Sequence, residues 1–226
     1  MHGIYLINKP AGITSHDVVD YLRKITNEKT IGHAGTLDPL ASGLMIVAIG
    51  REFTKKISNF SKLDKEYIAE ATLGATSTTY DKEGIIQNAK LKIKNNNIDQ
   101  KEIEQALDSF VGTYAQMPPI FSAKKIKGQK AYDLARQGKP VDLKPVNIKI
   151  YAIKLLDYQY PLLKFQVKVS SGTYIRSLID DVGKKLGEGA YMSGLIRTQI
   201  GEYDLSRAIN LQQIKSFNDI FPYKIK

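Results

Sequence analysis

The sequence predicts an α+β fold with a mixed, mostly antiparallel sheet flanked by helices. Residues 4–7 and 44–49 are short apolar runs, which is typical of buried strands. Residues 66–73, 146–155 and 163–169 alternate between apolar and polar side chains, as expected for strands with one buried face. Neighbouring strands are often joined by hairpin-length connections and not by regular crossover helices, which favours antiparallel pairing.

Helices are expected where apolar side chains recur at helical spacing or where a capping residue precedes them. The first follows Thr14, which begins a capping-box pattern that ends at Asp17. The predicted helices lie after residues 14–17, over residues 53–60, between Asp99 and Gly112, from Ile175 to Gly187, and after Asn210.

Residues 113–145 are less regular and are expected to form an excursion from the sheet. They include a Met-Pro-Pro segment and a short helix ended by Gly138. They also carry a cluster of basic side chains, namely Lys124, Lys125, Lys127 and Lys130. No linker rich in proline, glycine and serine divides the sequence, so a single domain over residues 1–226 is expected.

The composition restricts the classes of function. A net charge of +10, from 33 basic and 23 acidic residues, favours a polyanionic partner such as nucleic acid, although a lysine-rich surface can also serve only solubility. The chain has no cysteine and three histidines, so no metal site is expected. The sequence has no apolar run of roughly 18 to 20 residues and no signal peptide at its start, so a cytoplasmic protein without membrane contact is expected.

Two segments carry side chains suited to chemistry. Residues 32–43 form a glycine-punctuated loop that places Asp38 directly before a predicted strand, although Asp-Pro is also a common turn signal. Residues 170–176 lead into a helix and present Arg176 in its first turn, where the helix dipole disfavours a cation. Arg176 is therefore expected to have an anionic partner, either Asp180 or Asp181 on the same helix, or Asp38.

Four segments, taken in order, resemble the TruB family of bacterial tRNA pseudouridine synthases. They are residues 32–43, 65–67, 172–176 and 195–198, and the resemblance covers nearly the whole chain. It implies a pseudouridine synthase fold in which residues 113–145 form a thumb-like insertion. It also implies an isomerase that converts a uridine in the T-loop of tRNA, at position 55, to pseudouridine.

The resemblance implies a role for each matching residue. Asp38 resembles the family's catalytic aspartate, and Arg176 resembles the ionic partner of that aspartate. The residues that resemble substrate contacts are His33, Tyr67, Tyr174 and Leu195, of which Tyr67 stacks on the target uracil. Judged without the resemblance, Tyr67 would be a packing aromatic and Leu195 a core residue.

The reaction implied by the resemblance moves a base from nitrogen to carbon without a net change of formula, so no metal and no cofactor are expected. Asp38 either attacks the sugar or removes a sugar proton to form a glycal, and the sequence leaves both open. Extruding the nucleotide costs a few kcal/mol, of which stacking on Tyr67 returns roughly 1 to 3 kcal/mol. The four lysines of the insertion suit phosphate contacts with the T-stem-loop of tRNA, unless they form only a solvated basic loop.

The same resemblance implies a stand-alone enzyme with no guide RNA and no obligate protein partner. No full C-terminal PUA domain, a type of RNA-binding domain, is expected. Two other classes of function remain open at this stage. One is an RNA-binding protein without catalysis, and the other is a metal-dependent hydrolase using His33 and Asp38, which a chelator would inactivate.

Overall fold

A computed structural model describes residues 2–88, 98–122, 124–126, 128–131, 134, 137 and 141–225. The chain forms two compact units. Unit 1 comprises Met1–Ile68 and Gly194–Lys226, and unit 2 comprises Ala69–Ser193. Strands β4 (Lys65–Leu73) and β12 (Ala190–Ile200) each run from one unit into the other.

Unit 1 contains part of a mixed sheet with the strand order β14-β1-β3-β12. The strands that lie wholly in unit 1 are β1 (Gly3–Lys9), β2 (Ile31–His33), β3 (Ser42–Ile49), β13 (Tyr203–Asp204), β14 (Ile209–Asn210) and β15 (Lys224–Ile225). Its helices are α1 (Ser15–Thr26), α2 (Arg51–Thr54), α3 (Ile57–Ser61) and α7 (Phe217–Ile220). Three 3-10 turns complete it, η1 (Leu205–Arg207), η2 (Leu211–Gln213) and η3 (Phe221–Tyr223). Strand β1 pairs antiparallel with β3 and parallel with β14, while β3 pairs parallel with β12.

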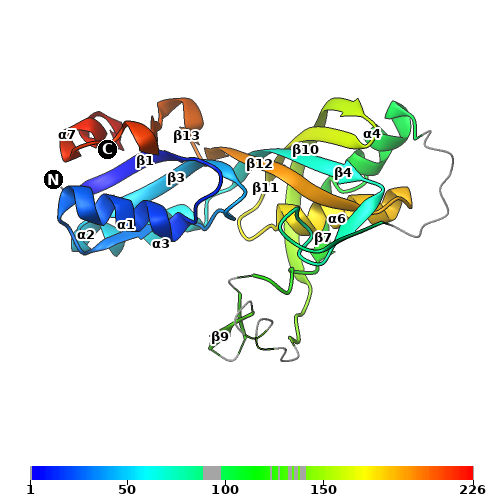
Figure 1. Cartoon of the computed structure of the whole chain (residues 1–226), viewed down its shortest axis with the longest axis horizontal. Helices are drawn as coiled ribbons and strands as arrows, with labels where there is room; N and C mark the ends of the chain where they lie inside the picture. The colour runs from blue at the N-terminus through cyan, green and yellow to red at the C-terminus, as the bar shows by residue number, and fades with distance from the viewer. Residues whose placement is uncertain are drawn as a thin grey trace. The chain divides into compact units, whose positions relative to one another are not determined.

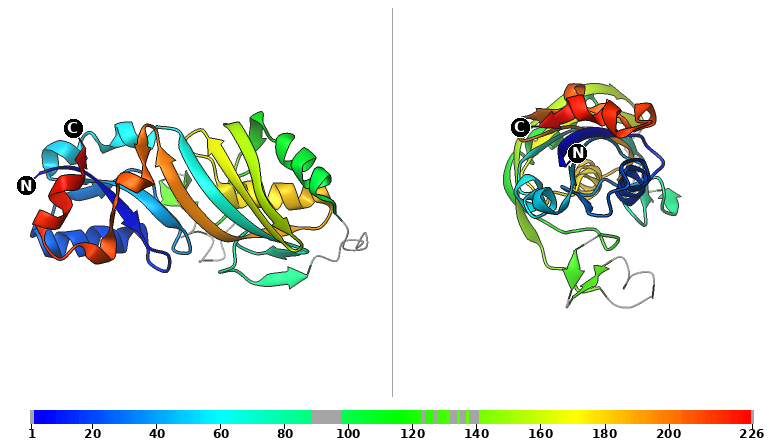
Figure 2. Two further views of the ribbon diagram at one scale, coloured as in Figure 1. Left: turned by 90° about the horizontal axis from the view of Figure 1, so that it is seen from above. Right: turned by 90° about the vertical axis from the view of Figure 1, so that its left-hand side faces the viewer.

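Both faces of the unit 1 sheet are covered. Helix α1 and the segment of α2 and α3 lie on opposite sides of β1 and β3 (Figure 2). Phe53, Ile57 and Phe60 pack against a buried cluster from the central strands, which includes Leu44 and Ile46. Burial on both faces explains why residues 44–49 are apolar without alternation.

Unit 2 is built around a run of paired strands in the order β4-β11-β10-β7. Its elements are β5 (Ala75–Ser77), β6 (Ile86–Asn88), α4 (Gln100–Asp108), β7 (Gly112–Gln116), β8 (Lys125–Ile126), β9 (Gln129–Lys130), β10 (Val146–Gln159), β11 (Leu162–Val169) and α6 (Ile175–Leu186). Strand β10 pairs antiparallel with β7 and with β11, and these strands curve around helix α6 (Figure 2). The hairpin of β8 and β9 projects away from this sheet (Figure 1).

The predicted α+β class and mostly antiparallel sheet are confirmed. The capping box of Thr14 and Asp17 is present at the start of α1, and Asp99 caps α4 with Glu102 in the same way. On β4, Tyr67 and its alternate neighbours are buried as the alternation predicted. The described helices are too short or too polar to pass through a bilayer.

Two predicted helices differ from the structure. The helix over residues 53–60 is two short helices, because Lys56 N–H bonds to the Phe53 carbonyl in a tighter turn between them. Apolar side chains three to four residues apart pack on the core in either geometry, so the spacing alone did not reveal the break. The helix expected after Asn210 is only the 3-10 turn η2, and the helix expected to end at Gly138 lies outside the described residues.

The predicted excursion of residues 113–145 begins later than expected. Residues 113–116 belong to β7 and pair with β10 in the sheet. The described residues that leave this sheet therefore lie between the end of β7 at Gln116 and the start of β10 at Val146.

Candidate active site

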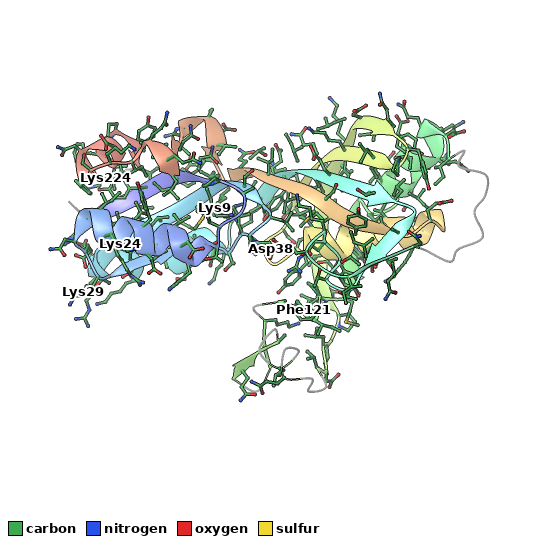
Figure 3. The ribbon with its side chains drawn as sticks, viewed as in Figure 1. Lys9, Lys24, Lys29, Asp38, Phe121 and Lys224 are labelled. Atoms are coloured by element: carbon green, nitrogen blue, oxygen red, sulfur yellow. The ribbon has the colours of Figure 1, made fainter. Side chains whose placement is uncertain are left out.

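Asp38 lies in the loop between β2 and β3 of unit 1, and its side chain is half-buried (Figure 3). The residue before it is held by the first residue of α1. The Ser15 hydroxyl donates to the Leu37 carbonyl at 3.1 Å and accepts from the Leu37 N–H at 2.8 Å. Ser15 is almost completely buried, so both hydrogen bonds are protected from water.

The residue after Asp38 is held as well. The Pro39 carbonyl accepts a hydrogen bond from Gly12 N–H at 2.8 Å and another from Lys9 Nζ at 3.3 Å. Lys9 is fully buried at the end of β1, and its ammonium group also donates to the carbonyls of Pro10 and Ile13. A buried ammonium that contacts three carbonyl groups fixes the backbone on one side of Asp38.

Arg197 joins the two ends of the same loop. Its guanidinium donates to the Leu44 carbonyl at 2.7 Å and to the Gly35 carbonyl at 3.2 Å, and its side chain is 1% exposed. On β12, Arg197 also lies opposite Gly43 on β3. A Cβ atom at Gly43 would collide with the Arg197 backbone, and the φ of +111° is one that favours glycine, so this close approach requires Gly43.

His33 ends β2, shortly before Asp38, and is half-buried. Burial lowers the pKa of its imidazole. A hydrogen bond with the Gly35 backbone raises this pKa, and the positive charge of Arg197 lowers it, so that the net effect is a lowered pKa. Within the described part of the chain, the Nδ1 atom of His33 has no hydrogen-bond partner. The lowered pKa favours the neutral imidazole, and its unpaired Nδ1 atom is buried inside the protein.

Tyr67 and Leu195 also lie in unit 1, on β4 and β12, and each is 8% exposed. Two residues before Tyr67, on the same face of β4, Lys65 is buried. Its ammonium group donates to the carbonyls of Ser61 and Leu63, both at 2.6 Å. These bonds attach the start of β4 to the end of α3 and thereby fix the strand that carries Tyr67.

The buried Lys65 makes stability depend on pH. Burial lowers the pKa of Lys65 from 10.5 to about 8, and Arg197 contributes to the lowering. Between these two pH values the unfolded chain binds more protons than the folded one, so the free energy of unfolding rises with pH. We expect the stability of the wild type relative to Lys65→Met, measured by urea unfolding, to increase across this window. The control is the substitution of an exposed neighbour, Lys62→Met, and the difference in stability between the wild type and this variant should not rise across the window. Parallel curves of stability against pH for the wild type and Lys65→Met would contradict the assignment.

Tyr174 and Arg176 lie in unit 2 where β11 leads into α6. Arg176 is 6% exposed, and its Nη1 forms an ion pair with Asp81 Oδ2 at 3.3 Å. The guanidinium also donates to the carbonyls of Thr79 at 3.1 Å and Phe121 at 3.0 Å. These planar, directed contacts use the donor geometry of arginine and hold the side chain in one orientation.

Asp81 was not among the anionic partners that the sequence suggested for Arg176. Asp180, one of the two suggested on the same helix, instead pairs with Lys184 at 2.6 Å. Asp81 is 3% exposed, and its backbone forms a parallel bridge with Met192 on β12. The pairing of Arg176 with Asp38 stays a prediction.

The four lysines of residues 113–145 are described to different degrees. Lys124 is half-buried and donates to the Lys144 carbonyl at 3.4 Å. The backbones of Lys125 and Lys130 pair across the hairpin of β8 and β9, while their side chains lie outside the description. Lys127 lies outside the described residues.

The described residues include no group of three or more histidine, aspartate or glutamate side chains placed to hold a metal ion. The candidate residues of unit 1 offer a carboxylate, an imidazole and a phenol, and those of unit 2 offer a phenol and a guanidinium. Groups of these kinds suit acid, base or nucleophilic chemistry on an organic substrate.

Several supporting residues were missed from the sequence. Ser15, Lys9 and Arg197 hold the Asp38 loop, and Asp81 holds Arg176. Lys9 is the last residue of β1 and Lys65 is the first residue of β4. A lysine at the end of a strand is normally exposed to solvent, so the sequence did not indicate that these two are buried. Arg197 lies within the fourth resembling segment, so its position was noticed but its role was not.

The fold agrees with what comparison with known proteins shows. Residues 23–175 match "TruB family pseudouridylate synthase (N terminal domain)", and residues 176–220 match "tRNA pseudouridylate synthase B C-terminal domain". These matches define the class as a pseudouridylate synthase, an isomerase.

Individual relatives match over almost the whole chain. A tRNA pseudouridine synthase B from Protochlamydia amoebophila is 46% identical over 97% of this chain and 82% of its own length. One from Clostridium acetobutylicum is 46% identical over 96% of this chain and 74% of its own. A solved chain from the "Crystal Structure of a Cbf5-Nop10-Gar1 Complex" matches with a TM-score of 0.70 and 30% sequence identity. The match covers 93% of the present chain and 52% of the solved chain. The chain belongs to the TruB family.

Proposed function

We propose that this enzyme converts a uridine in the T-loop of tRNA, at position 55, to pseudouridine, with Asp38 as the catalytic carboxylate. The relatives that match nearly the whole chain are tRNA pseudouridine synthases B, which supports tRNA as the substrate. The observation that carries the role of Asp38 is the anchoring of its loop. Buried side chains hold the residues on both sides of Asp38, which leaves one carboxylate on a rigid support.

Rigid support matters because a misplacement of about 1 Å can cost about 100-fold in rate. Ser15, Lys9 and Arg197 fix the backbone before reaction, so the carboxylate need not be ordered when RNA binds. An ionised Asp38 then acts at the ribose of the flipped nucleotide, either by attack on the sugar or by removal of a sugar proton. The resulting reaction needs no metal and no organic cofactor.

The other site residues act on the base and on the charge of the aspartate. Tyr67 stacks on the uracil, and stacking is worth roughly 1 to 3 kcal/mol per base. Tyr174 and Leu195 contact the flipped nucleotide, and neutral His33 provides a hydrogen-bonding nitrogen to the RNA. Arg176 pairs with Asp38 and keeps it ionised, while Asp81 fixes the orientation of Arg176.

The insertion of residues 113–145 grips the T-stem-loop through phosphate contacts from its lysines. We expect combined alanine substitution of Lys124, Lys125, Lys127 and Lys130 to weaken tRNA binding and to flatten its salt dependence. The logarithmic slope should fall by about one unit for each lysine that contacts a phosphate.

The matched control removes the same charge from the exposed side chains of Lys24, Lys29, Lys55 and Lys56 in unit 1. Figure 3 labels the first two of these lysines. Binding measured across a salt series should show the larger change of slope for the insertion variant. Equal slopes for both variants would mean that net charge, and not the insertion, attracts the RNA.

The function is tested by incubating the pure protein with an unmodified tRNA transcript and mapping pseudouridine at single-nucleotide resolution. Modification at the T-loop uridine alone, unchanged by a chelator, is the expected result. Chain cleavage that the chelator prevents would support a metal-dependent hydrolase, and binding without modification would support a non-catalytic RNA-binding protein. A cytoplasmic location and activity without a guide RNA or protein partner stay predictions.

A further inference from the structure

The side-chain amide of Gln116 makes two hydrogen bonds to the backbone of one site residue. Gln116 ends β7 and is 1% exposed. Its Oε1 accepts from the Tyr174 N–H at 2.8 Å, and its Nε2 donates to the Tyr174 carbonyl at 3.0 Å. The amide therefore binds Tyr174 as the backbone of a neighbouring strand would.

Tyr174 is the N-cap residue of α6, but its own side chain does not cap the helix. Its carbonyl also accepts the first hydrogen bond of the helix, from Leu178 N–H at 3.1 Å. Gln116 thus fixes the point at which α6 begins, which the sequence around Tyr174 does not fix locally.

The residues after Gln116 bind the first turn of the same helix. The Met117 carbonyl accepts from the Ser177 hydroxyl at 2.8 Å, and the Phe121 carbonyl accepts from Arg176 Nη2 at 3.0 Å. Arg176 and Ser177 are both buried, so leaving these groups unpaired would be costly. Residues 116–121 and the first turn of α6 are therefore joined at three points.

We propose that Gln116 is a positioning residue for pseudouridine formation. Its amide holds Tyr174 and, through the first turn of α6, aims the Arg176 side chain. The inference rests on the proposed function for the roles of Tyr174 and Arg176. Only a group with one donor and one acceptor in this geometry satisfies both backbone groups of Tyr174, which a leucine or an ionised carboxylate does not.

The first test measures the single-turnover rate and the RNA dissociation constant of Gln116→Leu with a T-stem-loop RNA. We expect the rate to fall by about 10- to 100-fold while the dissociation constant stays near the wild-type value. The control Tyr114→Phe removes the third bond of the amide, from Nε2 to the Tyr114 hydroxyl at 2.8 Å, and leaves both bonds to Tyr174. It should react at nearly the wild-type rate.

A second test uses the pH dependence of Gln116→Glu. A protonated glutamic acid can donate and accept as glutamine does, whereas the ionised form repels the Tyr174 carbonyl. The rate of this variant relative to the wild type should therefore rise as pH is lowered. A pH-independent ratio would argue against the two-bond role.

A double-mutant cycle asks whether Gln116 acts through Arg176. The combined loss in Gln116→Leu with Arg176→Lys should be smaller than the product of the two single losses. Independent losses, an unchanged rate in folded Gln116→Leu, or a change confined to the dissociation constant would overturn the proposal.

If Gln116→Leu does not fold, Ser177→Ala tests the same anchor, with Ser109→Ala as a control that loses a similar bond, to the Ala106 carbonyl at 2.7 Å. A rate loss confined to Ser177→Ala supports the proposal, and equal rates in both variants overturn it. An active Asp38→Asn variant would instead overturn the proposed function. An inactive Asp38→Asn variant together with a normal Gln116→Leu variant would overturn only this inference.

Discussion

Replacing Asp38 by asparagine is expected to reduce pseudouridine formation by at least about 10⁴-fold, as removal of a principal catalytic carboxylate does elsewhere. Asparagine has nearly the same shape and keeps the loop bonds of Leu37 and Pro39, which involve backbone groups. It lacks the negative oxygen needed at the ribose. Folding and tRNA affinity should therefore change little, and single-turnover rates beside binding curves would measure the separation.

The matched control is Asp20→Asn, also in unit 1. Asp20 is a partly exposed residue on α1 that pairs with Arg23 at 2.8 Å, and ion pairs near the surface contribute little to stability. This variant should retain full activity. Full product formation by Asp38→Asn would remove Asp38 from the catalytic role.

Replacing Arg176 by alanine is expected to lower turnover by about 10²- to 10³-fold, the range seen when one preorganised electrostatic contact is lost. The loss in tRNA affinity should be smaller, because Arg176 is 6% exposed and directed by Asp81, Thr79 and Phe121 within unit 2. Unpairing the buried Asp81 also lowers stability, so rates should be compared well below the melting temperature of the variant.

Lys184→Ala provides the control for Arg176→Ala. It removes another cation from α6, one whose ion pair with Asp180 is formed by a largely exposed lysine. Near-normal turnover is expected. If Arg176→Ala weakens tRNA binding more than turnover, Arg176 belongs to the RNA-docking surface and not to the reacting centre.

Much of the fold was predictable because its causes are local. Alternation over residues 66–73 reflects the opposite directions of successive side chains in a strand, and the structure confirms β4 there. The capping boxes of α1 and α4 depend on residues three positions apart. The break between α2 and α3 was not predictable, since core packing satisfied the apolar spacing without a continuous helix.

For the candidate site, the sequence offered a set of residues but not their contacts. The motifs predict Asp38, Tyr67 and Arg176 as site residues from their residue types and order along the chain. They contained no information that Arg176 binds Asp81. That pair forms only when the segment between β5 and β6, which carries Asp81, packs against α6, which carries Arg176. The same holds for Gln116, whose amide is paired with the backbone of a residue 58 positions away.

The sequence by itself determined the α+β class, the position of most strands, the starts of α1, α4 and α6 and the family of the protein, because these follow from neighbours a few residues apart and from ordered motifs. Only the tertiary structure decided which buried groups hold the loop that carries Asp38. Ser15 and Leu37 are 22 positions apart, and Arg197 and Leu44 are 153 apart. Hydrogen bonds across such separations depend on the packing of whole elements, which brings a buried donor to one particular carbonyl among many.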